Sequence, residues 1–305
     1  VGTDSIPTQR SETAARQLQI PRVAVVGLLI TLVGASAVIA ENRLQDLRVG
    51  RDVDITAHRG SSRYAPENTL AALKQAITDG ADYAEIDAQE TADGVVVLLH
   101  DTDLMRIAGL PTKIWDANFD DLRQVDAGRW FSPDFVGEQI PTLEEALLVA
   151  GERIGLNIEL KFNGHDQQLA ERVVALIRRA GCADRCIITS LNQHGLERVR
   201  ELAPEIRVGQ IVTVAIGDVT KLDVDLLSMN QEQVTPAQLR INRGAGLATH
   251  VWTVNTPADM ARMLDYGVDN IITDEPATAR ALVDERAQLS DAELLLLALG
   301  RQLRD

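Results

Sequence analysis

Cysteine, aromatic residues and positive charge are all scarce in this sequence of 305 residues. Two cysteines cannot make the disulfide framework of a small secreted domain. The 30 basic residues are outnumbered by 45 acidic ones, and a net charge of −15 argues against nucleic acid as a partner, because phosphate backbones bind basic surfaces. Aromatic residues make up only 3% of the chain, so its core must consist mainly of Leu, Val, Ile and Ala.

Long uncharged runs are nearly absent as well, and the one exception is the stretch from Val23 to Ala40. Its 18 residues reach the lower limit for a helix that crosses about 30 Å of hydrocarbon. A secretory signal that ends at Ala35-Ser36-Ala37 and a buried soluble helix are the alternatives. The apolar run continues past that site and has no polar face, so we predict a transmembrane helix at residues 23–40 after a polar segment at residues 1–22. Arginines are equally frequent on both sides of the run and assign no orientation.

Beyond a polar linker at residues 41–52, about 250 residues remain, which is a typical size for a (βα)8 barrel. Short apolar, β-rich runs alternate with helical stretches, and this alternation indicates a parallel sheet with helices outside it. The predicted strands are Val53–His58, Tyr83–Asp87, Val95–His100, Gly155–Lys161, Cys186–Ser190, Arg207–Val212, Leu226–Met229, His250–Val254 and Asn270–Thr273. We expect the barrel at residues 53–286. A C-terminal helix at residues 287–305 should begin at the capping box Ser290-Asp291-Ala292-Glu293 and pack its leucines on the barrel.

Nine predicted strands are one too many for eight barrel positions, and the spacing identifies the exception. Only residues 91–94 separate the second and third strands, which is too short for a crossover helix, and Asp93-Gly94 is a tight-turn signal. We therefore expect a hairpin that turns at Ala92–Asp93 and places Glu85 opposite His100. Such a hairpin makes the barrel a distorted one.

Acidic residues stand at the ends of two predicted strands, where barrel enzymes carry their active sites. Glu85 and Asp87 are two apart on one strand and share a face, and Glu159 ends another strand. Three carboxylates placed together would repel one another without a cation. Their hard oxygen atoms suit Ca²⁺ or Mg²⁺ rather than Zn²⁺.

Basic residues and histidines end other strands in the same way. Arg59 and Lys161 are the cations expected around a phosphate group. His58 and His100 form an acid and base pair that works near neutral pH. A metal site, a phosphate clamp and two histidines together predict the cleavage of a phosphate ester.

These motifs make the chain resemble the glycerophosphodiester phosphodiesterase family. The match begins with residues 55–101 and covers about residues 53–285, with HRG, ENT, EID, HD, ELK, WTVN and ITDEP in the family's order. The resemblance implies a TIM barrel enzyme that uses a divalent metal to hydrolyse glycerophosphodiesters to sn-glycerol 3-phosphate and an alcohol. The site residues it implies are His58 and His100 as catalytic groups, Glu85, Asp87 and Glu159 as metal ligands, Arg59, Lys161 and Trp252 around the substrate, and Glu67 and Asn68 as either helix-start or supporting residues.

The N-terminal helix resembles the last span of a subgroup in which further membrane helices precede the barrel. Family members of this kind scavenge diesters outside the cell. The resemblance therefore implies a barrel on the outer side of the plasma membrane.

Several features remain open at this level. Residues 102–150 are expected to cap the pocket, and four aromatic residues of this excursion either pack within it or contact substrate: Trp115, Trp130, Phe131 and Phe135. Asp274 and Pro276 are expected to shape the last loop. Cys182 and Cys186 suit either a local disulfide or a pair of free thiols.

Two other functions compete with this interpretation. The same barrel residues would serve a lysophospholipase D-like enzyme or a phosphodiesterase of glycerophosphate polymers. A sensor that binds lipid or phosphate without turnover is the third hypothesis, and the intact histidine pair argues against it.

Overall fold

The computed structural model describes residue 41 and residues 44–48, 50, 52–165, 167–213 and 219–302. The predicted membrane helix at residues 23–40 and the polar segment before it lie outside these residues. Within the described part of the chain, no helix combines the length and the apolar character that crossing a membrane requires.

Eight parallel strands form a closed barrel, because β1 pairs with both β2 and β9. The ninth strand, β3, pairs antiparallel with β2 and lies outside the ring. The strands are β1 (Asp54–Ala57), β2 (Tyr83–Glu90), β3 (Val96–Leu98), β4 (Gly155–Leu160), β5 (Cys186–Ser190), β6 (Arg207–Val212), β7 (Leu226–Asn230), β8 (Ala248–Trp252) and β9 (Asn270–Thr273). The predicted barrel is thus confirmed, and the surplus strand is the one that the spacing identified.

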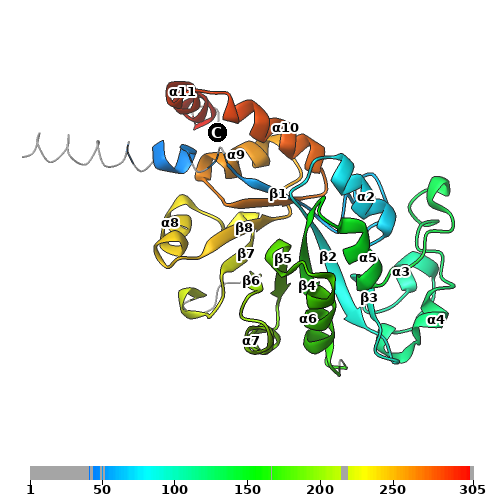
Figure 1. Cartoon of the computed structure of the whole chain (residues 1–305). Helices are drawn as coiled ribbons and strands as arrows, with labels where there is room; N and C mark the ends of the chain where they lie inside the picture. The colour runs from blue at the N-terminus through cyan, green and yellow to red at the C-terminus, as the bar shows by residue number, and fades with distance from the viewer. Residues whose placement is uncertain are drawn as a thin grey trace, which may run out of the picture. The chain divides into compact units, whose positions relative to one another are not determined.

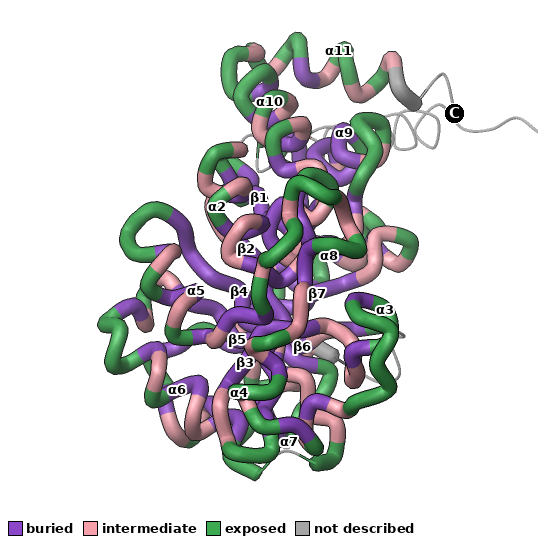
Figure 2. The backbone as a smooth tube through the Cα atoms, turned by 90° about the vertical axis from the view of Figure 1, so that its right-hand side faces the viewer, coloured by how far each residue is buried: buried purple, intermediate pink, exposed green. Residues whose placement is uncertain are grey.

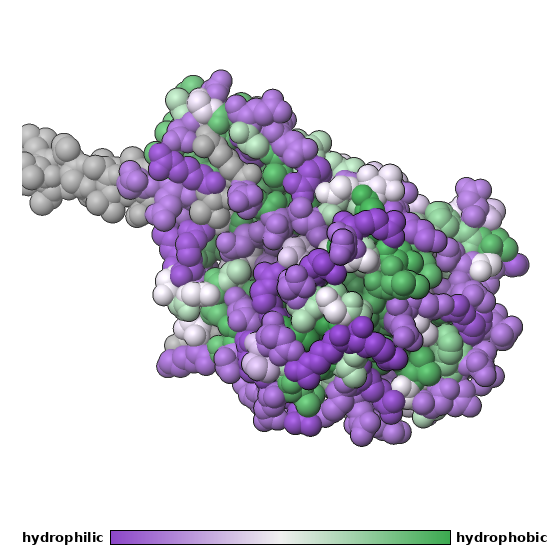
Figure 3. Space-filling view, viewed as in Figure 1, coloured by the Kyte–Doolittle hydropathy of each residue, from purple (hydrophilic) through white to green (hydrophobic). Residues whose placement is uncertain are grey.

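Helices surround this ring on its outer side (Figure 1). They are α2 (Leu70–Thr78), α3 (Met105–Ala108), α4 (Phe119–Leu122), α5 (Leu143–Ala150), α6 (Leu169–Ala180), α7 (Gln193–Leu202), α8 (Pro236–Gly244), α9 (Pro257–Tyr266), α10 (Pro276–Ala287) and α11 (Asp291–Gln302). The strands are buried, whereas the helices expose their outer sides (Figure 2). The surface of one face is mostly hydrophilic with smaller hydrophobic areas (Figure 3), as expected when each helix turns one apolar face toward the barrel.

Threonine side chains cap the starts of four of these helices. Thr69, Thr142, Thr235 and Thr256 each accept a hydrogen bond from the backbone N–H three residues further on, at the starts of α2, α5, α8 and α9. A proline follows the cap in α8 and α9, where its missing N–H costs no helical hydrogen bond. These caps end each loop close to the carboxyl end of the preceding strand.

The hairpin of β2 and β3 forms as predicted, but its register is shifted by one residue. Ala88 pairs with Leu98, and the loop between Thr91 and Val95 has three residues rather than the two of the expected turn. Gly94 causes the shift, because it takes a left-handed conformation (φ 78°) that adds one residue to the turn. Glu85 is therefore not directly opposite His100, and the prediction of that pair was wrong.

The strand bounds differ from expectation at β8 as well. It runs from Ala248 to Trp252, two residues earlier than predicted, because Ala248 already pairs with Leu226 of β7. As a result, Trp252 ends the strand and its side chain lies at the rim of the barrel interior.

The end of the predicted linker packs against the barrel. Leu47 is buried, and the buried Asp46 carboxylate lies 3.0 Å from Arg240 and 3.5 Å from Arg243 of α8. Since α8 ends just before β8 begins, this contact lies at the amino-terminal end of the strands.

The capping box of α11 is present. The Ser290 N–H donates to Glu293, and the Glu293 N–H donates back to the Ser290 hydroxyl at 3.4 Å. Leu294 is fully buried, whereas Leu296 is 69% exposed, so the helix packs through one edge only.

Candidate active site

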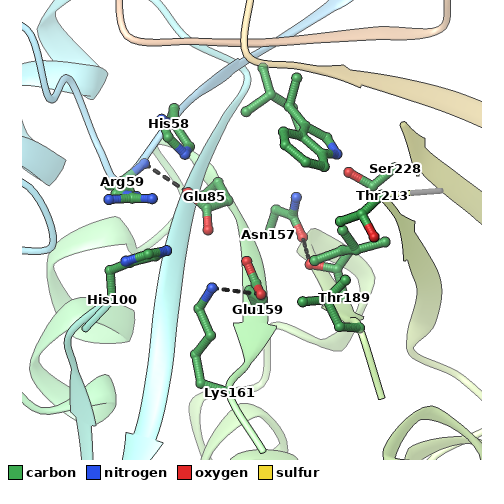
Figure 4. A pocket seen from close by; sticks show the side chains of 14 residues that line it. His58, Arg59, Glu85, His100, Asn157, Glu159, Lys161, Thr189, Thr213 and Ser228 are labelled. Atoms are coloured by element: carbon green, nitrogen blue, oxygen red, sulfur yellow. Dashed lines mark hydrogen bonds and ion pairs between the residues drawn. The ribbon is translucent and has the colours of Figure 1, made fainter. Parts of the chain in front are cut away.

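A cavity of about 190 Å³ opens at the carboxyl ends of the barrel strands. Figure 4 shows charged side chains on one side of it and hydroxyl groups on the other. The cavity is lined by His58, Arg59, Glu85, His100, Asn157, Glu159, Lys161, Thr189, Leu191, Ile211, Thr213, Ser228, Trp252 and Ile272. Most of the residues predicted for the site therefore lie in one pocket, although they come from distant parts of the chain.

The three predicted metal ligands lie together on two neighbouring strands. Asp87 of β2 is paired in register with Glu159 of β4, and Glu85 is two residues earlier on the same face of β2. Oxygen atoms of the three carboxylates all lie within 4.8 Å of one another. This spacing allows all three groups to bind a single ion.

The ionisation of these carboxylates depends on their burial and on their charged neighbours. Burial, together with the Asp87 carboxylate, raises the pKa of Glu85 to about 8 and also raises the pKa of Glu159. Burial opposes the ionisation of Asp87, but Lys161 and Arg59 outweigh it and lower the pKa of Asp87. A bound divalent cation would favour the ionised form of Glu85 against both its burial and the negative charge of Asp87, so the donor set fits a hard metal ion.

Hydrogen bonds from the loop between β1 and α2 hold two of these carboxylates. The Arg59 N–H donates to Glu85 at 2.8 Å. Asn68 donates its side-chain amide to Asp87 at 2.7 Å and accepts the Asp87 N–H at 2.9 Å. Arg59 and Asn68 both have positive φ angles, 53° and 57°, which few residues adopt without such contacts. Asn68 therefore supports a carboxylate of this cluster, and the residue whose side chain caps α2 is Thr69.

Both predicted phosphate-binding cations contact acidic groups in this structure. The Lys161 ammonium lies 2.7 Å from Glu159 and 3.0 Å from Asp87. Arg59 donates to Glu67 at 2.9 Å, and its Nε lies 3.6 Å from Asp87. They border the cavity beside the carboxylate cluster.

Each of the two pocket histidines has its own carboxylate partner. His58 Nδ1 lies 2.7 Å from Asp274, and His100 Nδ1 lies 2.9 Å from Asp101. A carboxylate on Nδ1 favours the tautomer that leaves Nε2 free to exchange a proton with a ligand. The two rings are thus arranged alike, from different strands.

Asp274, which is expected to shape the last loop, also contacts a pocket histidine. Besides His58, it accepts hydrogen bonds from Ser62 and from Asn255 of the WTVN motif. Burial opposes its ionisation, but the hydrogen bond from His58 lowers the pKa of Asp274 to about 2. Burial lowers the pKa of His58, whereas Asp274 and Glu85 outweigh it and raise that pKa. Asp274 and His58 are 216 residues apart in the sequence. They lie in contact because β1 and β9, which they follow, are neighbours in the closed barrel.

The uncharged side of the pocket was missed from the sequence, except for Trp252. Thr189 donates to the Asn157 side chain at 3.0 Å, and Ser228 and Thr213 also line the cavity. The Trp252 indole N–H is buried and has no hydrogen-bond partner among the described residues. This side offers hydroxyl and N–H groups to the organic part of a ligand.

The excursion at residues 102–150 has its own small apolar core, which includes Leu104, Ile114 and Leu122. Phe119 packs against that core, whereas Trp115, Trp130, Phe131 and Phe135 belong neither to it nor to the described pocket lining. Trp115 stacks on His165 with ring centres 4.3 Å apart, and Phe131 meets both Trp130 and Phe135 edge to face.

The cysteine pair lies at the start of β5, whereas the pocket is lined by residues at the carboxyl end of this strand. Cys182 and Cys186 are buried free thiols with sulfur atoms 3.4 Å apart. Burial first, and then Cys182, raise the pKa of the Cys186 thiol.

Comparisons with known proteins agree with this geometry. Residues 58–278 match the model of the Glycerophosphoryl diester phosphodiesterase family. The chain is 33% identical over 239 residues to a glycerophosphodiester phosphodiesterase of Caldanaerobacter subterraneus, which spans 75% of this chain and 97% of that protein. It is 32% identical over 247 residues to a glycerophosphodiester phosphodiesterase of Bacillus subtilis, covering 72% of this chain and 83% of that one.

A solved structure shows the same fold. It is that of an Oleispira antarctica phosphodiesterase in complex with the product sn-glycerol-3-phosphate, with a TM-score of 0.72 and 31% identity over 76% of this chain and 96% of the other. The chain therefore belongs to the glycerophosphoryl diester phosphodiesterase family, a family of enzymes.

Proposed function

We propose that this protein hydrolyses glycerophosphodiesters to sn-glycerol 3-phosphate and an alcohol with the help of a bound Ca²⁺ or Mg²⁺ ion. The observation that carries the proposal is one cavity that holds three carboxylates within 4.8 Å and two histidines, each paired with its own carboxylate. Glu85, Asp87 and Glu159 would hold the ion. When bound, it supplies positive charge that stabilises the phosphoryl oxygens and lowers the pKa of a coordinated hydroxyl.

The remaining steps follow from the chain's own residues. Arg59 and Lys161 bind the phosphoryl group and stabilise its negative charge as the transition state forms. Of His58 and His100, one removes the proton from the attacking hydroxyl and the other protonates the leaving alkoxide, each through Nε2. By family resemblance, the attacking group is the glycerol 2-hydroxyl of the substrate, and water then opens the resulting cyclic phosphate. The uncharged groups around Trp252 bind the organic part.

A product assay on the purified chain tests this proposal. Glycerophosphocholine, glycerophosphoethanolamine and lysophosphatidylcholine are supplied in turn, with Ca²⁺, with Mg²⁺ or with a chelator, and sn-glycerol 3-phosphate and free alcohol are measured. Metal-dependent release of both products from a glycerophosphodiester is expected. Turnover of lysophosphatidylcholine alone would establish the lysophospholipase D-like alternative, and binding without turnover would establish a sensor.

We also propose that residues 23–40 tether the barrel to the plasma membrane, with the barrel on the outer side. The support is the length and composition of this run, together with the resemblance to members that scavenge diesters outside the cell. The full chain should then remain in the membrane pellet after alkaline carbonate extraction. A protease added to whole cells should degrade the barrel, and an intact barrel after this treatment would contradict the outer location.

A further inference from the structure

Arg106 lies outside the described pocket lining, on α3 in the excursion, yet it contacts the partners of two pocket residues. Its Nε donates to Asp101 at 2.6 Å, and its NH2 donates to Glu67 at 2.7 Å. A guanidinium is planar and rigid, so two carboxylates bound to its edges are held at a fixed distance and angle from each other.

Each of these carboxylates also binds a residue that lines the pocket. Asp101 uses its other oxygen to contact His100 Nδ1 at 2.9 Å. Glu67 Oε1 accepts a second hydrogen bond, from Arg59 NH1 at 2.9 Å. A continuous series of polar contacts therefore runs from His100 through Asp101, Arg106 and Glu67 to Arg59.

The face of the same guanidinium is supported by the excursion. The Arg106 Cζ atom lies 5.0 Å from the centre of the Trp130 ring, whose indole N–H donates to the Ala127 carbonyl at 2.8 Å. Such a cation–π contact favours the cation at this position. The Arg106 side chain is 37% exposed, so the water that competes for its donors is only partly excluded.

We propose that Arg106 is a positioning residue that holds the His100 ring and the Arg59 guanidinium at a fixed separation on the charged side of the pocket. This inference rests on the proposed function, in which His100 transfers a proton and Arg59 binds the phosphate. It also gives the excursion a role in the reaction itself, through Trp130 and Arg106. Misplacing a reacting group by about 1 Å can cost on the order of 10²-fold in rate. Loss of the Arg106 guanidinium, which binds Asp101 and Glu67 together, should therefore lower kcat.

Three variants of the full chain test the proposal: Arg106→Gln, Arg106→Lys and Arg129→Gln. Arg129 serves as the matched control, because it is an exposed arginine of the same excursion whose ion pair, with Asp126 at 3.2 Å, does not involve a pocket residue. The readouts are kcat and KM on a glycerophosphodiester, Ca²⁺ affinity by calorimetry, the melting temperature, and the NMR signal of the His100 Nδ1 proton.

We expect Arg106→Gln to lower kcat roughly 10- to 100-fold, with KM, Ca²⁺ affinity and melting temperature near those of the wild type, and to shift the His100 proton signal. Arg106→Lys keeps the positive charge but cannot bind two carboxylates through one planar group, so its kcat should lie between those of the wild type and Arg106→Gln. Arg129→Gln should behave like the wild type. Wild-type kcat in Arg106→Gln, or a loss of kcat matched by a fall in melting temperature, would overturn the proposal.

Failure of the proposed function looks different. The wild type would then be inactive on every glycerophosphodiester. The His100 signal still decides the positioning role in that case: a shift in Arg106→Gln but not in Arg129→Gln supports it, and an unchanged signal overturns it.

Discussion

The two halves of the pocket differ in kind. The half formed by β1, β2 and β4, with the segment after β3, carries His58, Glu85, His100, Glu159 and Lys161, whereas the lining residues from β5 to β9 carry no charge. Figure 4 shows this division, with the histidines and Arg59 on one side and Ser228 and Thr213 on the other. The ionisable groups thus occupy a compact sector rather than the whole rim.

The difference suits a division of labour in which one half of the pocket carries out the reaction and the other half binds the organic part of the substrate. Charges placed close together change one another's pKa values: burial together with Asp87 raises the pKa of Glu85, whereas Lys161 and Arg59 lower the pKa of Asp87 against its burial. The uncharged half has no such coupling, so its residues can change with little effect on the three carboxylates. We therefore expect the first half to determine the rate and the second to determine which substrate binds.

Metal removal should have the largest effect on the rate of hydrolysis, because the proposed ion is bound by three residues of the charged half. Exhaustive chelation should abolish hydrolysis, because the three carboxylates then lose the cation that neutralises them. Added Ca²⁺ or Mg²⁺ should restore the activity. Glu85→Gln should weaken metal binding far more than Glu67→Gln, whose side chain contacts Arg59 and Arg106 instead. Calorimetric titration measures both affinities. Unchanged activity after chelation would mean that the cluster binds no catalytic ion.

Loss of a pocket histidine should come next in size. His58→Ala and His100→Ala should each lower the rate on the order of 10²–10⁴-fold, the usual contribution of general acid–base catalysis, with little change in binding. The p-nitrophenyl ester of sn-glycerol 3-phosphate keeps the glycerol 2-hydroxyl but needs almost no protonation of its leaving group. It should therefore restore the rate of the variant that lacks the acid but not of the variant that lacks the base. Near-native rates in both variants would exclude the two-histidine mechanism.

The charged half could be predicted from the sequence because its residues form short motifs at strand ends. EID and ELK each place two or more site residues within three positions, and β2 pairs with β4 in the register that brings Asp87 to Glu159. Strand positions were predictable for a similar reason: β5, β6 and β9 have the expected bounds, because each is a short apolar run between polar segments.

The uncharged half and the supporting contacts could not be predicted in this way. Thr189 and Ser228 are common strand residues that carry no local signal, and their role depends on which way a strand faces. Asp274 and Arg106 act through partners distant in the sequence, so their contacts depend on barrel closure and on the fold of the excursion. The hairpin register failed for a local reason, since one left-handed glycine changes a turn by one residue.

Asp274→Asn tests the boundary between the two halves, because β9 brings this carboxylate next to His58 of β1. The substitution should lower kcat roughly 10- to 100-fold, the usual cost of losing a group that orients an imidazole. The pKa of His58 should fall, since burial still lowers it while the opposing effect of Asp274 is gone. The limb of the pH–rate profile that reports His58 should therefore move to lower pH. A profile that keeps its shape and position would show that Asp274 only shapes the loop.

Substitutions in the uncharged half should have the smallest effects, and these should appear in KM rather than kcat. Ser228→Ala removes a hydroxyl from the cavity lining, and one hydrogen bond contributes about 0.5–1.5 kcal/mol, which corresponds to a roughly 2- to 10-fold rise in KM. Ser290→Ala, at the start of α11, is a control for the same chemical change outside the pocket lining. If the uncharged half binds the organic part of the substrate, Ser228→Ala should also weaken competitive inhibition by sn-glycerol 3-phosphate and leave inhibition by inorganic phosphate, which has no organic part, unchanged. An equal change for both inhibitors, or a change in kcat instead of KM, would mean that Ser228 acts on the phosphate chemistry and that the two halves are not separate in function.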